Sequence, residues 1–173
     1  GVQTCALPIL FINLCKVPTE HFGWLFGSVA AGMVAGSQVN GRMPHRIALW
    51  KVLRVANLVQ LVAAILLTAS VVSGLGGLPV VYFCIFVYIA AQGFVFPNGS
   101  AIAMTRHGQI VGSASALLGT NQFLIAAVGT SFLGFLDNPA VPMTLVILIC
   151  AVVSTALNYL TLGPRLETGP VAS

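Results

Sequence analysis

The chain has 173 residues and a formal net charge of +4, and only 6% of its residues are Asp, Glu, Lys or Arg. An average globular domain has about 25% charged residues, and the mean hydropathy here is +1.01. This composition excludes a soluble domain and a basic nucleic-acid-binding face. Because a hydrocarbon core about 30 Å thick needs about 20 apolar residues per helix, the recurring apolar stretches predict an all-α membrane protein.

The first residues are interpreted separately from the fold. The segment 1–9 has no initiator Met and resembles the translation of a sequencing-library adapter. We expect it to be an artefact, with the natural chain cut near Leu10; a short apolar tail is the alternative. On this expectation the chain is the C-terminal part of a longer protein, and the segment 10–15 is the stub of an earlier span.

Five apolar segments are long enough to cross a bilayer, and breaks rich in Gly or Pro separate two pairs of them. Gly74–Pro79 is predicted to form a tight turn, and Asp137–Pro139 another. The predicted spans cover residues 22–40, 52–73, 78–104, 110–136 and 141–162.

Basic residues gather at one end of these spans. On a path that alternates sides, six of the seven Lys and Arg residues fall on the same side, and the two predicted turns carry none. The positive-inside rule makes that side cytoplasmic, so the tail 163–173 is predicted to be cytoplasmic. The same cations are able to contact anionic lipid head groups, which makes membrane lipid an expected partner. They are Arg42, Arg46, Lys51, Arg54, Arg106 and Arg165.

Small residues form two stripes at helical spacing. Gly32 and Gly36 share one helix face, and Gly112 and Ala116 share another. Small residues allow the close backbone approach on which helix association in lipid depends. Both stripes are therefore predicted to be packing seams, and a seam that slides during a conformational cycle has the same pattern.

Polar residues within the spans are the candidates for a substrate cavity. A side chain that faced lipid would leave its hydrogen-bonding groups unsatisfied, so these residues should face other helices or a wet cavity. Pro97 interrupts the third span, either as a plain kink or as a broken helix at a binding site or gate. The cavity candidates are Tyr88, Gln92, Asn98, Asn121 and Gln122.

Reactive groups are absent from the middle of the predicted spans. No Asp, Glu, Lys or Arg lies there, and the cysteines and histidines show no ligand spacing. The sequence therefore predicts no catalytic residue, no metal site and no cofactor. Because proton relays in membranes use titrating groups, proton coupling through a carboxylate is not expected from this part of the protein.

Two motifs resemble the drug-resistance transporters of the Bcr/CflA type, within the major facilitator superfamily. The first runs from Phe96 to Met104, and the second, Gly-Ser-Ala-Ser-Ala-Leu-Leu-Gly followed by Gln122, runs from Gly112. The resemblance covers residues 10–162 and implies a truncated C-terminal six-helix half, whose missing N-terminal half holds the proton-coupling residues. The loop with Arg42 and Arg46 lacks the Asp of the superfamily's gating motif, so a charge-relay gate there is in doubt.

The resemblance implies export of small drugs or toxic metabolites in exchange for protons, by alternating access, in a bacterial inner membrane. A major facilitator for an amino acid, sugar or other metabolite is one alternative. A membrane scaffold subunit that transports nothing is the alternative of another class.

Overall fold

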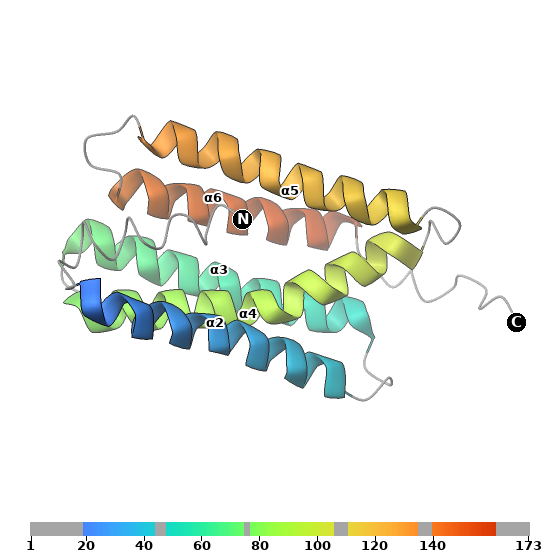
Figure 1. The fold of residues 1–173 in the computed structure, drawn as a ribbon, viewed down its shortest axis with the longest axis horizontal. Helices are drawn as coiled ribbons and strands as arrows, with labels where there is room; N and C mark the ends of the chain where they lie inside the picture. The colour runs from blue at the N-terminus through green and yellow to red at the C-terminus, as the bar shows by residue number, and fades with distance from the viewer. Residues whose placement is uncertain (1–18, 44–47, 75–76, 106–110, 135–139, 162–173) are drawn as a thin grey trace, which may run out of the picture.

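A computed structural model of the chain describes residues 19–43, 48–74, 77–105, 111–134 and 140–161. Every regular element in these ranges is an α-helix, so the prediction of an all-α membrane protein is confirmed (Figure 1). The segments 1–9 and 163–173 lie outside the described residues. The helices are α2 (Thr19–Arg42), α3 (Leu49–Ser73), α4 (Gly77–Thr105), α5 (Val111–Gly134) and α6 (Ala140–Thr161).

Three of these helices have the length and apolar composition of a membrane span within the described residues. They cover Leu49–Ser73, Gly77–Ile102 and Val141–Thr161. The 25 residues of α3 rise about 37 Å at about 1.5 Å per residue, more than the hydrocarbon core requires. In α5 the apolar stretch is shorter, Ser115–Gly129, and α2 is diluted by Gly, Ser and amide side chains. That these two helices also cross the bilayer stays a prediction.

The helices pack in an order that differs from their order along the chain. α2 lies against α4, α4 against α3, and α3 against α6, whereas α5 contacts α4 only sparsely (Figure 1). The core runs between α3, α4 and α6, where Leu67 and Thr144 are almost fully buried. Large apolar side chains such as Val55, Phe83 and Phe123 point outward, as expected for a protein whose surrounding solvent is lipid.

Glycine brings α2 and α4 into close contact. A Cβ atom at Gly36 would lie 2.5 Å from the carbonyl oxygen of Ala90, and one at Gly32 would lie 2.8 Å from the ring of Phe86. Gly93 faces them from α4, where a Cβ would collide with the backbone of α2. The backbones approach this closely because none of the three positions carries a side chain.

The second small-residue stripe has no such neighbour. A Cβ at Gly112 would meet nothing within 4 Å, and Ala116 is exposed. Among the described residues, the face of α5 that carries this stripe is therefore not packed against another helix. Its role as a packing seam stays a prediction.

The third predicted span is one unbroken helix. α4 runs through Pro97 to Thr105, and its C-terminal part rises toward the start of α5 in Figure 1. Proline removes a backbone donor and crowds the preceding turn. The helix therefore changes direction near Pro97 but does not break. The preceding helix, α3, ends at Ser73 and is capped by Gly74, which has a φ of 66° and whose N–H donates to the carbonyl of Ser70 at 3.1 Å.

Candidate functional site

Each packed pair of helices is joined by polar side chains as well as by apolar contacts. The α2–α4 pair has the hydroxyls of Ser28 and Tyr82 at 2.6 Å from each other. In the α3–α6 pair, Ser154 donates to Oδ1 of Asn57 at 3.2 Å, and Thr68 donates to the carbonyl of Thr144 at 3.3 Å. Interhelical hydrogen bonds are one of the forces that hold helices together in lipid.

The polar contact between α3 and α4 lies near the middle of both helices. Nε2 of Gln60 donates to Oε1 of Gln92 at 2.5 Å and to the carbonyl of Tyr88 at 3.4 Å. Gln60 and Tyr88 are buried, with 4% and 5% of their surface exposed. All three residues lie near the middle of their helices, and therefore close to the level of the bilayer midplane.

Gln92 has hydrogen-bonding capacity beyond this contact. A glutamine amide offers one oxygen acceptor and two N–H donors, and the bond from Gln60 uses only the oxygen. Gln92 is half-buried, and its own nitrogen donates to no described residue. A polar ligand at midplane depth would find an N–H donor there, held in place by a buried partner.

Asn98 ties α2 to α4 near the end of both helices. It is buried, and its Nδ2 donates to Oδ1 of Asn40 at 2.7 Å and to the carbonyl of Phe94 at 2.8 Å. Both amide hydrogens thus have partners within the protein. The structure assigns Asn98 a contact between helices, and its predicted place in a cavity wall stays a prediction.

The other predicted cavity residues are on α5, apart from the Gln60–Gln92 pair. Asn121 is exposed and Gln122 is half-buried, and neither forms a hydrogen bond with Gln60 or Gln92 in the described structure. Their part in one cavity with Gln92 stays a prediction. Of the predicted loop residues, Arg42 is exposed at the end of α2, and Arg46 lies outside the described residues.

The structure also shows contacts that the sequence analysis missed. Gln60 is the buried partner of Gln92, and two mid-span amides on consecutive helices were the available signal. Arg54 stacks on Trp50 and Tyr159, with its guanidinium carbon 4.9 Å and 4.7 Å from the two ring centroids. Trp50 precedes Arg54 by one helical turn, a spacing that places both side chains on one face.

No group of three or more metal-ligating side chains occurs in the ranges that the structure describes. The polar groups at midplane depth are amides, hydroxyls and one phenol. Such groups bind by hydrogen bonding and supply neither a nucleophile with its base nor a metal-activated water.

Two curated proteins are similar to the chain. It is 30% identical over 149 residues to the protein of Bacillus subtilis (strain 168) named "Uncharacterized MFS-type transporter YdgK". The aligned region covers 86% of the chain and 37% of that protein. It is 25% identical over 161 residues to the "Bicyclomycin resistance protein homolog" of Haemophilus influenzae. That aligned region covers 92% of the chain and 40% of the relative. The chain thus spans about two fifths of the length of these relatives. No family model and no solved structure matches the chain.

Proposed function

We propose that the chain is most of the C-terminal half of a major facilitator secondary transporter of the drug-efflux type. Three features support this: the similarity to an MFS-type transporter and a bicyclomycin resistance homolog, the apolar helices of spanning length, and the polar cluster at midplane depth. The whole protein would export small drugs or toxic metabolites in exchange for protons, in a bacterial inner membrane with the C-terminus in the cytoplasm.

The observation that carries the proposal is the Gln60–Gln92 pair. Secondary transporters bind substrate near the bilayer midplane, between two repeats that move relative to each other. Gln92 lies at that depth on α4, with an unused N–H donor and an oxygen fixed by Gln60. In the proposed mechanism this donor contacts a polar group of the substrate, and the apolar residues around it accommodate the rest.

The proton carrier of the proposed exchange must lie outside this part of the chain. The three acidic residues of the chain are Glu20, Asp137 and Glu167, so none lies at midplane depth in α3, α4 or α6. Because intramembrane proton relays use titrating side chains, we assign the coupling step to the N-terminal half, which the longer relatives lead us to expect. The C-terminal half would then supply substrate contacts and helix movement.

Replacing Gln92 by Leu in the restored full-length transporter tests the proposal. We expect tolerance to some drugs to fall and tolerance to others to be kept, with the amount of protein in the membrane unchanged. Drug tolerance of a pump-deficient host would be measured over a panel of compounds, beside immunoblots of the membrane fraction. Gln38→Leu, at an exposed glutamine of α2, is the matched control. Loss of tolerance to every drug in proportion to lost protein would indicate a folding role and contradict the proposal.

A further inference from the structure

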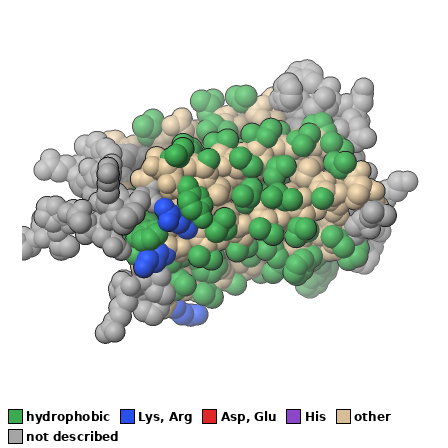
Figure 2. Space-filling model, turned by 180° about the vertical axis from the view of Figure 1, so that it is seen from behind, with side chains coloured by type: hydrophobic (Ala, Val, Ile, Leu, Met, Phe, Trp, Pro, Cys, Tyr) green, Lys and Arg blue, Asp and Glu red, His purple; other side chains and the backbone are tan. Residues whose placement is uncertain are grey.

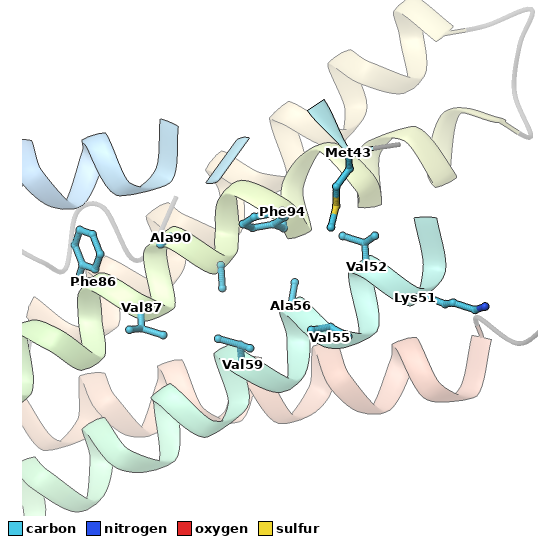
Figure 3. Close-up of a pocket in the computed structure, with 11 residues that line it drawn as sticks. Met43, Lys51, Val52, Val55, Ala56, Val59, Phe86, Val87, Ala90 and Phe94 are labelled. Carbon is cyan, nitrogen blue, oxygen red and sulfur yellow. The ribbon is translucent and has the colours of Figure 1, made fainter. Parts of the chain in front are cut away.

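An apolar groove of about 440 Å³ lies between α3 and α4. Met43, the residue that follows α2, also lines it. Figure 3 shows the side chains that face it from the two helices. Val55 is 62% exposed, so the groove opens on the outside of the bundle, where lipid is expected. Its walls include Val52, Val55 and Val59 of α3, Val87 and Phe94 of α4, and Met43.

The groove is separate from the candidate substrate site. Gln60, Tyr88 and Gln92 are not among its lining residues, and Lys51 is the one charged or polar side chain that is. An occupant would therefore be apolar over most of its length, with a charged or polar group at one end only.

The positive charge lies at the end of the groove where the helices reach the membrane boundary. Lys51 is in the first turn of α3 and extends outward past the groove in Figure 3, and Arg42 ends α2 next to Met43. Lys and Arg side chains gather at this end of a largely apolar face in Figure 2. The sequence has no acidic residue between Glu20 and Asp137, so the charge is complementary to an external anion.

The groove spans about two thirds of the depth of one leaflet of a bilayer. From Val52 to Val59, α3 rises about 10 Å at about 1.5 Å per residue, and half of the hydrocarbon core is about 15 Å thick. An acyl chain that entered beside Lys51 would lie along valine and phenylalanine side chains for most of its leaflet. It would end near the middle of the membrane.

We propose that this groove is a binding site for an anionic phospholipid, with one acyl chain between α3 and α4 and the phosphate beside Lys51. The apolar walls bind the acyl chain, and Lys51 provides the preference for a negatively charged head group. The proposal does not depend on what the protein transports.

The test is lipid retention by the purified chain in detergent, measured by native mass spectrometry. The probes are phosphatidylglycerol and phosphatidylcholine with identical acyl chains, added in equal amounts. We expect one phosphatidylglycerol to be retained, with a preference of about fivefold, which one basic residue at an anionic surface provides. No retained lipid, or equal retention of the two lipids, would overturn the proposal.

Three variants distinguish binding of the lipid in this groove from nonspecific attraction of anionic lipid to the protein surface. Val55→Trp fills the groove and should reduce phosphatidylglycerol retention several-fold, whereas Val62→Trp, at a valine of the same helix that is 55% exposed and outside the groove, should not. Lys51→Gln alters an exposed side chain, so the fold is kept; the preference between the lipids should disappear while acyl binding remains. Equal retention in both tryptophan variants, or binding of a second copy of the chain instead of lipid, would overturn the site.

Discussion

At the scale of single residues, the glutamines on α3 and α4 share a hydrogen bond near the middle of both helices. An amide alone in hydrocarbon leaves donors and acceptors unpaired, which costs several kcal/mol. Gln60 is buried and donates to Gln92. The shared hydrogen bond lowers the free-energy cost of placing the two amides within the membrane. Each therefore depends on the other, which makes their contributions to stability non-additive.

A double-mutant cycle should measure this dependence. Gln60→Leu and Gln92→Leu should each lower the free energy of unfolding in detergent, and the double variant should lower it by less than the sum. The coupling should be about 0.6 kcal/mol and no more than about 1.7 kcal/mol, the range for hydrogen bonds between membrane helices. Reversible unfolding followed by circular dichroism gives the values, and strictly additive losses would show that the two amides do not act as a pair.

At the scale of helices, the contact between α2 and α4 depends on positions that lack a side chain. Gly32, Gly36 and Gly93 face each other across this seam, and the Ser28–Tyr82 and Asn98–Asn40 hydrogen bonds lie along the same pair of helices. Close backbone approach increases dispersion contacts, which replace the hydrophobic effect as the attraction between helices in lipid.

Gly93 and Gly99 of α4 form a matched pair of test sites. At Gly93 an added methyl group would lie 2.8 Å from the backbone nitrogen of Ser37, whereas at Gly99 it would meet nothing within 4 Å. Gly93→Ala should therefore lower the free energy of unfolding by about 1–3 kcal/mol through overpacking. Gly99→Ala should leave it unchanged or raise it by up to about 1 kcal/mol, because alanine favours the helix. Unfolding in detergent measures both, and equal effects would contradict the close contact at Gly93.

The sequence predicts the helices better than their contacts. Apolar length and polar breaks are local properties, so the five predicted segments needed no knowledge of the fold. Gly93 was missed because its role depends on α2 lying opposite, which local spacing does not reveal. Gln92 was singled out as an intramembrane amide, but its partner Gln60 follows only from the arrangement of α3 and α4. Asn98 belongs to the same class, because its contact with Asn40 joins residues 58 positions apart.

At the scale of the whole molecule, the described helices form one side of a larger assembly in the proposed transporter. The outward side chains of α5 are mostly exposed, including Leu117, Phe123 and Val128, and this helix contacts α4 only sparsely. The relatives are more than twice as long as the matched region. A transport pathway between two halves would need both of them.

Cells that produce only this chain should therefore gain no drug tolerance. Production of the N-terminal half of the restored gene together with this chain should recover part of the tolerance of the full-length transporter. Growth inhibition in a pump-deficient host, with membrane levels of both polypeptides measured, gives the comparison. Drug efflux by this chain alone would contradict the proposed division into two halves.

Because α2 packs mainly against α4, its main contacts form only after α4 has been synthesised. The Tyr82 hydroxyl that meets Ser28 belongs to a residue 54 positions further along the chain, which a ribosome reaches roughly 3–11 s later at about 5–20 residues per second. During that interval α2, which we predict to cross the bilayer, is without its partner while α3 is being made. Its glycine face stays open to chaperones, to the insertion machinery or to the wrong helix, and the helical hairpin of α3 and α4 is then the surface on which α2 docks. Variants in which α4 is inserted more slowly should therefore lower the yield of folded protein more readily than they lower its free energy of unfolding.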